Sequence, residues 1–514
     1  MKTFYIKCSA LAMIALLAAS AVSAQINTLY YMEAVPTRHE LNPSFQPLPN
    51  SYYSLLPVYS GLYMSVGNNS LALEDVAYPK RTAGGDYRTV MFFNGEYGNV
   101  DDFYKRLKNT TRVYSEVELK LFAMGLRLRN SSYLTIGLST KTSAGVFIPK
   151  DFAKLLIYGA PDETGINSFN FDRLGIRANV YTELAAGYSR QIDDKLTVGG
   201  KLKLLMGHAN VTTKIDRIRL NASRDRWDID IKGTVNMSAP GIDYELDNNG
   251  EMIDNIDIDP FDNFSFANMN GGYGAAIDLG ANYKLLDDRL RVSASLLDLG
   301  FINWKKDNAV NMSASETFEF EGANIKIKDG VANWDEDYFK DIEDEIEYST
   351  TSKSYSSALA AKVMLGAEYG ILNRKLTFGA LSKSTIINKS IFQEITASVN
   401  YVQFSFFNAS LSYSLLNGRF GTYGLGLGGR MGPINIYVAG DYMPLKYAKQ
   451  YIPSKNKAFN LQWGFLLNFG YKASKNVDDD GDGVQNRKDR CPDTPEGVPV
   501  NRDGCPMETE TAEN

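Results

Sequence analysis

The chain has 514 residues and a formal net charge of −6, and this acidic balance argues against a protein that binds nucleic acid. It contains 31 Tyr, 26 Phe and 43 Gly, a composition that suits neither a coiled coil nor a disordered chain. An all-β protein with belts of aromatic residues accounts for this composition better.

Residues 1–24 predict an export signal. Lys2 and Lys7 give the start of the chain a positive charge, residues 11–19 form a short apolar run, and small side chains precede a cleavage point ahead of Gln25. The run is too short to cross a bilayer as a helix, which argues against the alternative of a membrane anchor. The mature protein is therefore expected to be exported.

Residues 25–51 follow the signal and contain four prolines. Because proline lacks a backbone N–H and fixes its φ angle, we expect an irregular segment here. This segment either stays in the periplasm or enters the lumen of a barrel as a plug.

Residues 458–471, AFNLQWGFLLNFGY, contain the clearest local pattern. Every second residue from Phe459 to Tyr471 is large and apolar, whereas the residues between them are small or polar, with the exception of Leu466. Side chains of a strand alternate between its faces, so one face of this strand is wholly apolar. A soluble sandwich can contain such a strand, but its length and its aromatic ends are more typical of a transmembrane β-barrel.

The same alternation recurs in hairpins with short polar turns. Over residues 178–206, Leu184 and Leu202 are expected on the lipid face, while Lys201 and Lys203 are expected to face the lumen. Four hairpin turns are predicted, at Asp193-Asp194, Asp287-Asp288, Asn373-Arg374 and Gly432-Pro433.

The predicted fold is a transmembrane antiparallel β-barrel of about 14 strands over residues 52–471, with a short calcium-loop tail. An even strand number returns both termini to one side of the membrane, which is the periplasm if the short turns are periplasmic. The strands are expected at 52–66, 113–129, 133–143, 176–191, 196–212, 271–286, 289–302, 357–372, 375–387, 394–404, 406–416, 421–431, 434–443 and 458–471.

Long connections separate many of these strands and are assigned to the outer side of the membrane. The stretch 226–238 also alternates, and we place it in a hairpin that projects from the connection 213–270. The long connections are 67–112, 144–175, 213–270, 303–356 and 444–457.

Three stretches carry a resemblance to a known family. They are LNPSF at 41–45, LDLGFINW at 297–304 and GPINIYVAGD at 432–441. Over roughly residues 27–471 the chain resembles the Bacteroidetes outer-membrane barrel family DUF5723, and more distantly PorP-like and FadL-like barrels. The resemblance implies an outer-membrane barrel and implies no activity.

The tail, residues 472–514, has the spacing of a calcium loop. Asp478, Asp480 and Asp482 fall at positions 1, 3 and 5, and Gly483 at position 6 permits a sharp turn. The remaining oxygen ligands for Ca²⁺ would come from the carbonyl of Val484 and from the side chains of Asn486 and Asp489.

Two cysteines lie in the same tail. Cys491 and Cys505 are expected to form a disulfide, because the two are close together in an exported chain. Asn501 and Asp503 are weaker candidates for a second, partial calcium site. The tail resembles a thrombospondin type 3 repeat of OmpA-like proteins, and the alternative is a disordered acidic tail.

Catalytic chemistry has little support in the sequence. His39 and His208 have no metal-ligand spacing, and we expect no enzyme. The acidic stretches 251–262 and 335–348 are interpreted as solvated loops, and GLGLGG at 424–429 as small residues on a barrel wall rather than a phosphate loop.

Three hypotheses for the function follow. The first is an envelope or secretion-complex scaffold, in which a calcium-stiffened tail presents the barrel to a periplasmic or envelope protein partner. The alternatives are a FadL-like or porin-like channel for small solutes and a surface adhesin. A channel should leave open space in its lumen, whereas a scaffold can be filled throughout, and each places the barrel in outer-membrane lipid.

Overall fold

The computed structural model describes most of the chain from residue 26 to residue 507, and the predicted signal lies outside it. The described residues are 26–54, 61–81, 87–94, 98–128, 131–159, 167–223, 226–239, 242–246, 253–258, 270–320, 326–328, 331–333, 348–387, 390–403, 406–416, 420–443, 457–471, 483–484, 490–491, 494–495 and 498–507.

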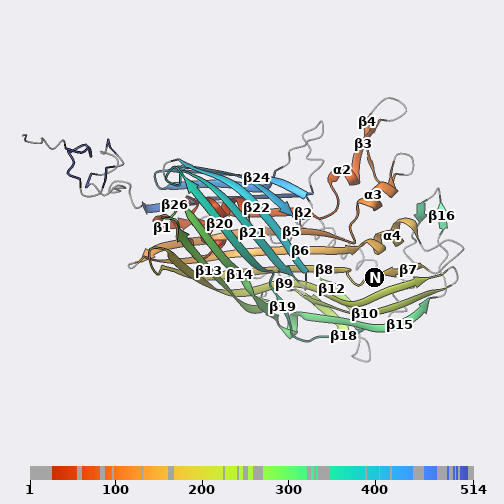
Figure 1. Cartoon of the computed structure of the whole chain (residues 1–514). Helices are drawn as coiled ribbons and strands as arrows, with labels where there is room; N and C mark the ends of the chain where they lie inside the picture. Colours follow the sequence, from red (N-terminus) through yellow and green to blue (C-terminus); the bar gives the residue numbers. More distant parts are fainter. Residues whose placement is uncertain are drawn as a thin grey trace, which may run out of the picture.

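The described chain forms one closed antiparallel barrel (Figure 1). The first strand position is shared by β1 and β2, and each later strand pairs with the next around the barrel. In this order the strands are β1 (Pro49–Ser54) with β2 (Leu62–Asn68), β5 (Thr110–Leu128), β6 (Ser132–Pro149), β8 (Gly175–Gln191), β9 (Leu196–Ala222), β13 (Gly272–Leu285), β14 (Leu290–Trp304), β20 (Ala361–Ile371), β21 (Leu376–Ile387), β22 (Ser390–Gln403), β23 (Phe407–Leu416), β24 (Phe420–Met431), β25 (Ile434–Met443) and β26 (Ala458–Tyr471).

The circle closes because β26 pairs with β25 on one side and with both β1 and β2 on the other. Strands β1 and β2 in turn pair with β5. Closure leaves no strand edge with unpaired backbone groups, which hydrocarbon would not satisfy. The prediction of a barrel of 14 strands is confirmed, and each predicted strand corresponds to one strand position.

The predicted tight turns are formed by residues that accept left-handed or side-chain-stabilised conformations. Asp287 and Asp288 have φ of 51° and 65°, and Asn373 has φ of 50°. Asp193 instead accepts two hydrogen bonds with its carboxylate, from the backbone N–H groups of Lys195 and Leu196, both at 2.7 Å. Short polar side chains make such turns inexpensive, which is why they were visible in the sequence.

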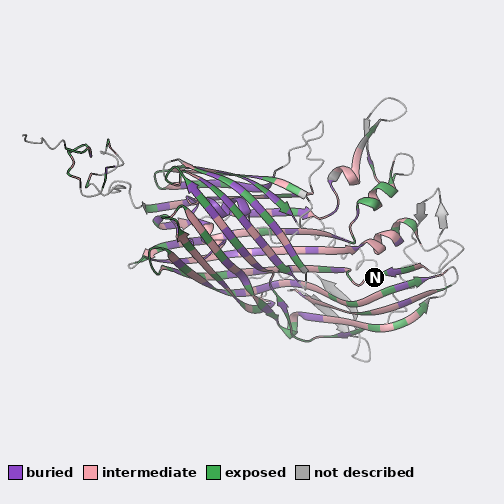
Figure 2. Ribbon diagram, in the orientation of Figure 1, coloured by how far each residue is buried: buried purple, intermediate pink, exposed green. Residues whose placement is uncertain are grey.

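Exposed and buried residues alternate along the strands, as Figure 2 shows. The side chain of Leu202 is 67% exposed on the outer face of β9, whereas Lys201 and Lys203 are each 6% exposed in the lumen. On β26 Phe459 and Phe469 are again exposed on the outer face, while Leu466 is fully buried inside. The predicted faces are therefore correct for these strands.

An extension continues the barrel wall beyond one end (Figure 1). Strand β9 runs on to Ala222 and pairs there with β10 (Trp227–Ser238), which pairs with β15 (Ala309–Phe320). The predicted hairpin at 226–238 is thus a strand, but one of its two partners comes from the separate connection 303–356. Helix α4 (Lys150–Tyr158) and strand β7 (Asn167–Asn170) pack here around Phe169, Leu220 and Ile229.

The connections that the sequence analysis left as loops contain further short elements. No helix in the described part of the chain is long and apolar enough to cross a membrane. The short elements are α2 (Leu73–Val76), β3 (Ala77–Arg81), β4 (Tyr87–Met91), α3 (Val100–Arg106), β11 (Ile242–Leu246), β12 (Ile253–Ile258), η3 (Lys306–Asn308), β16 (Lys326–Lys328), β17 (Val331–Asn333), β18 (Ser349–Thr351) and β19 (Tyr355–Ala358). Of the two acidic stretches, residues 251–252, 259–262 and 335–347 lie outside the described residues.

Candidate functional site: the lumen of the barrel

The lumen contains residues 26–48, which we call the inner segment. Its two 3₁₀ helices, η1 (Asn27–Tyr31) and η2 (Pro36–Glu40), join a core cluster with apolar residues of the wall that point inward. Tyr30 is fully buried in this cluster, and so is Leu466. Leu466 breaks the polar pattern of β26 because its lumen face packs into an apolar core rather than against water.

Glycines of the wall make room for the inner segment. A Cβ atom at Gly199 would collide with the carbonyl of Pro43, and one at Gly379 would collide with the ring of Tyr31. A side chain at either position would therefore push the segment off the wall. Further wall glycines in the same kind of contact are Gly280, Gly366, Gly424 and Gly426, of which the last two belong to the GLGLGG run.

Strand β25 holds the start of the inner segment with side chains from the GPINIYVAGD stretch. The carboxylate of Asp441 accepts hydrogen bonds from the backbone N–H groups of Asn27 and Thr28, at 2.6 and 2.9 Å. The amide of Asn435 donates to the carbonyl of Ala34 at 3.1 Å. These residues lie at alternate positions, so the period of the strand places them on one face.

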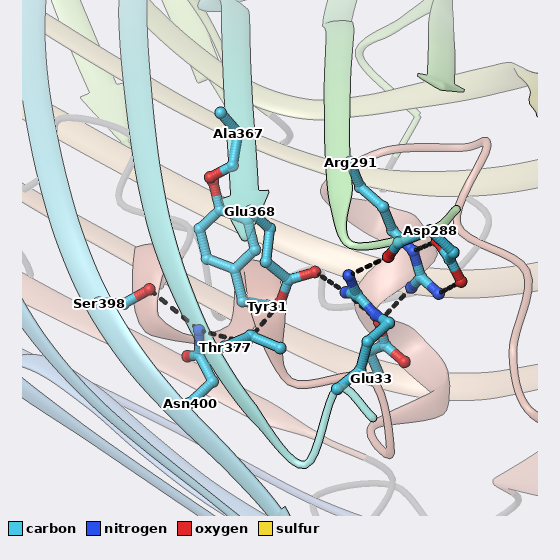
Figure 3. A network of polar contacts seen from close by, with 10 residues as sticks. Tyr31, Glu33, Asp288, Arg291, Ala367, Glu368, Thr377, Ser398 and Asn400 are labelled. Carbon is cyan, nitrogen blue, oxygen red and sulfur yellow. Dashed lines mark hydrogen bonds and ion pairs between the residues drawn. The ribbon is translucent and has the colours of Figure 1, made fainter. Parts of the chain in front are cut away.

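An arginine cluster holds the inner segment at the end with the tight turns (Figure 3). The carboxylate of Glu33 forms ion pairs with Arg291 and Arg374, and Arg374 also forms one with Glu368. Arg291 is in turn paired with Asp288 at 2.5 Å. Burial alone would raise the pKa of Glu33, but Arg291, Arg38 and Arg374 together lower it to about 2, so this carboxylate is charged.

The second 3₁₀ helix contacts the opposite wall through His39 and Glu40. Burial lowers the pKa of His39 well below its usual range, and the charges of Lys201 and Lys120 lower it further. The imidazole is therefore neutral, and it shares a hydrogen bond with the hydroxyl of Tyr52. Glu40 forms an ion pair with Lys120.

Six buried charges meet in the lumen, and we call them the ion-pair cluster. Lys203 lies 2.8 Å from Asp278 and 2.5 Å from Asp298. Lys362 lies 3.0 Å from the other oxygen of Asp298. The remaining pair is Lys141 with Glu183 at 2.9 Å, and Lys203 lies 3.7 Å from Glu183.

Each side chain of the cluster is 10% exposed or less, and three lysines face three carboxylates. Removing charges from water is costly, so a buried cluster of this kind survives only when every charge is paired. The residues come from six strands, β6, β8, β9, β13, β14 and β20, and the cluster therefore ties together almost half of the wall.

A β-bulge in the LDLGFINW stretch delivers one of these carboxylates. The pairing of β13 with β14 shifts register between Ile277 and Leu279, and Asp298 has a left-handed φ of 56°. As a result Leu297 and Asp298 both point into the lumen, where a regular strand would send one of them outward. The backbone N–H of Asp298 donates to Asp278 at 2.8 Å, which holds the bulge in place.

Two cavities border the ion-pair cluster. The segment cavity, with a volume of about 60 Å³, lies between the inner segment and the wall, and its lining includes Glu40, Glu183 and Lys203. The mouth cavity, toward the extension, also has a volume of about 60 Å³, and its lining includes Asp298 and Lys362. Lys141 lines both, so the cluster separates the two spaces.

The sequence analysis found part of this site. It placed Lys201 and Lys203 in the lumen, but it did not join them to any carboxylate. Glu183 and Asp278 sit next to outward-facing leucines in alternating strands, so the same period-two argument would have placed them inside. The bulge at Asp298 has no such signal.

The predicted calcium site falls largely outside the described residues. Asp478, Asp480, Asp482, Asn486 and Asp489 are not among them, whereas Val484 is. Gly483 has a φ of 88°, a conformation that glycine accepts without strain. Within the described part of the chain, no group of three or more His, Cys, Asp and Glu side chains is arranged to hold a metal ion.

The end of the tail is a small disulfide-linked loop. Cys491 and Cys505 are bonded, with their Cα atoms 5.0 Å apart. The side-chain oxygen of Asn501 accepts hydrogen bonds from the backbone N–H groups of Asp503 and Cys505, at 2.9 and 3.2 Å. Asn501 therefore stabilises this turn, a role that competes with its predicted role as a calcium ligand.

The family described as "Family of unknown function (DUF5723)" matches residues 43–441, which is well over half of the chain. The chain belongs to the DUF5723 family. The matched region begins inside the inner segment and ends at Asp441, so it includes both the bulge of β14 and the residues of β25 that hold the segment. No curated protein matches this DUF5723 chain.

Solved structures with a similar arrangement are bacterial barrels. The TodX deltaS2S3 mutant monoaromatic hydrocarbon channel has a TM-score of 0.40 and 11% identity, covering 84% of this chain and 94% of that one. The Pseudomonas putida toluene transporter TodX has a TM-score of 0.37 and 11% identity, covering 84% and 92%. A Pseudomonas aeruginosa FadL homologue has a TM-score of 0.40 and 10% identity, covering 88% and 100%.

Proposed function

We propose that this protein is a plugged channel of the outer membrane that passes a small solute through its lumen. The observation that carries the proposal is the pair of cavities on the two sides of the ion-pair cluster. A solute would enter from the extension into the mouth cavity, pass the cluster and reach the segment cavity. The inner segment closes the rest of the path and must move to open it.

The contacts of the inner segment suit a plug that moves. Several are polar, such as those of Thr28 with Asp441 and of Glu33 with Arg374. Polar contacts can be exchanged for contacts with water at modest net cost, because each contributes only about 0.5–1.5 kcal/mol, or 1.5–3 kcal/mol when charged. Apolar packing around Tyr30 also holds the inner segment in the lumen.

The scaffold hypothesis explains the lumen less well. A scaffold needs neither hollow space nor buried charges in its lumen, and buried charges often contribute less stability than apolar packing would. Lys141, Lys203 and Lys362 with their partners therefore support the channel alternative of the sequence analysis over its first hypothesis.

A reversible tether tests the proposal. The hydroxyl oxygens of Thr28 and Ser412 lie 2.7 Å apart, so Thr28→Cys with Ser412→Cys places two sulfurs within bonding reach. Conductance would be measured in planar bilayers for the double variant, oxidised and then reduced, and for a chain lacking residues 26–48. We expect no conductance when the introduced disulfide is formed, channel openings after it is reduced, and the largest conductance after the deletion.

Thr28→Cys alone and Ser412→Cys alone are the controls for the reductant, since reduction must not change the conductance of either variant. A deleted chain that assembles as a barrel but stays electrically silent would leave the scaffold as the better hypothesis. The assembled state is checked separately by the shift in electrophoretic mobility between folded and heated protein.

We also propose that the tail binds Ca²⁺ as a short spacer in the periplasm. The disulfide between Cys491 and Cys505 and the left-handed Gly483 support a compact tail. Such a segment has almost no apolar core, so an ion and a disulfide would have to replace one. The spacer would present the barrel to an envelope protein without taking part in conduction.

A further inference from the structure

The mouth cavity has an excess of positive charge. Four of its lining residues are basic and two are acidic, so its lining carries a net charge of about +2. Two of the basic residues, Lys141 and Lys362, are neutralised by Glu183 and Asp298 of the ion-pair cluster, and once Glu183 is counted the excess is about +1, from Arg112 and Arg177 against Glu116. The basic residues are Arg112, Lys141, Arg177 and Lys362, and the acidic residues are Glu116 and Asp298.

Arg112 is placed to receive an anion. Its guanidinium carbon lies 4.6 Å from the centre of the Phe392 ring, and its buried Nε has no hydrogen-bond partner. Within the described part of the chain, Arg112 forms no ion pair. A guanidinium held against an aromatic ring with donors left over is a common arrangement for binding a carboxylate, which it contacts with two parallel hydrogen bonds.

Much of the rest of the lining is apolar, although Ser143 and Asn179 also belong to it. Tyr114 from β5, Phe147 from β6 and Tyr181 from β8 face the cavity, and Leu359 and Ile387 complete it. An inorganic anion would leave these aromatic and aliphatic surfaces without a partner, and a neutral hydrocarbon would leave Arg112 without one.

We propose that the mouth cavity binds a small organic monoanion, a carboxylate attached to a compact apolar body. The carboxylate lies against Arg112 and the apolar body against Tyr114, Phe147 and Tyr181. Lys141 and Lys362 line the same cavity, so an anion that leaves Arg112 meets the lysines of the ion-pair cluster next. This inference rests on the proposed channel function and names the class of solute that the channel accepts.

Isothermal titration of the full chain in detergent tests the inference, with benzoate as the probe. Benzyl alcohol supplies the same ring without the charge, and inorganic phosphate supplies the charge without the ring. We expect benzoate to bind saturably, and benzyl alcohol and phosphate each to bind at least roughly tenfold more weakly. Benzyl alcohol binding as tightly as benzoate would overturn the inference.

The variant Arg112→Gln should weaken benzoate binding by roughly tenfold or more, because it removes the charge but keeps a polar side chain. Arg190→Gln is the matched control, since Arg190 is exposed on β8 and lies outside the mouth cavity. Equal affinity of the Arg112→Gln variant and the unmodified chain would also overturn the inference. Conductance after reduction of the Thr28–Ser412 tether is independent of benzoate, so a failed titration with normal openings rejects the solute class and leaves the channel intact.

Discussion

The two halves of the lumen satisfy their polar groups in different ways. Toward the tight turns, the inner segment bonds with the wall: Tyr31 donates to the carbonyl of Ala380 at 2.5 Å, and Asn42 donates to that of Ala294 at 3.2 Å. Toward the extension, the charges of the wall bond with one another and leave space beside them. The first half is therefore filled by the inner segment, whereas in the second half buried ion pairs border a cavity.

The largest expected effect comes from breaking the ion-pair cluster. Asp298→Ala removes the carboxylate that pairs with both Lys203 and Lys362, and an uncompensated buried charge should lower the free energy of unfolding by about 3–5 kcal/mol. Urea unfolding in detergent micelles measures it. Asp194→Ala, in an exposed turn, should stay within about 0.5 kcal/mol. Equal stability of the two variants would mean that the cluster is solvated.

The next largest effect should separate the lipid face from the lumen face. Leu202→Arg places a charge on an outward side chain that is 67% exposed, at an expected cost of about 2–4 kcal/mol near the membrane midplane. Folding into lipid vesicles measures it. Leu156→Arg on α4, in the extension, is the same substitution away from the strands of the barrel, and we expect it to be nearly neutral. Matching losses would show that Leu202 does not face lipid.

A smaller effect is expected where the inner segment meets the wall. A Cβ atom at Gly426 would collide with the sulfur of Met32, so Gly426→Val should loosen the segment by about 1–3 kcal/mol. The readout is the labelling rate of a cysteine introduced as Thr28→Cys, which should rise at least roughly tenfold. At Gly429 an added Cβ atom has its nearest neighbour at 3.9 Å, so Gly429→Val should leave the rate unchanged. Unchanged labelling in both variants would contradict the close packing of the inner segment against the wall at Gly426.

The smallest effect on the barrel should come from the tail. Calcium titration of the full chain should give heat that Asp480→Ala with Asp482→Ala abolishes, because carboxylate oxygens are the ligands that calcium prefers. Barrel unfolding should be identical with and without the two substitutions. A double variant that binds calcium as well as the unmodified chain would place the ion elsewhere.

The strands were predictable because the lipid imposes a period of two on every one of them. The contacts of the lumen-facing side chains were less predictable, because their partners lie far away in the chain. Glu33 and Arg374 are 341 residues apart, and no local pattern joins them. The pairing of β10 with β15 escaped prediction for the same reason, because each strand belongs to a different connection. The carboxyl group of Asp441 and the amide of Asn435 on β25 were visible in the sequence, but not the segment that they hold.

The bulge at Asp298 also decides which residues of β14 face outward. Before the bulge the even residues of β14, such as Val292 and Ala294, face outward, and after it the odd residues, such as Leu299 and Phe301, do so. The outward-facing residues of β14 are therefore even-numbered before the bulge and odd-numbered after it, and the extra residue of the bulge causes this change. A regular strand of the same length would turn Leu299 and Phe301 toward the lumen and Trp304 toward the lipid, whereas deleting Asp298 alone would close the bulge and leave the outward faces of both halves as they are.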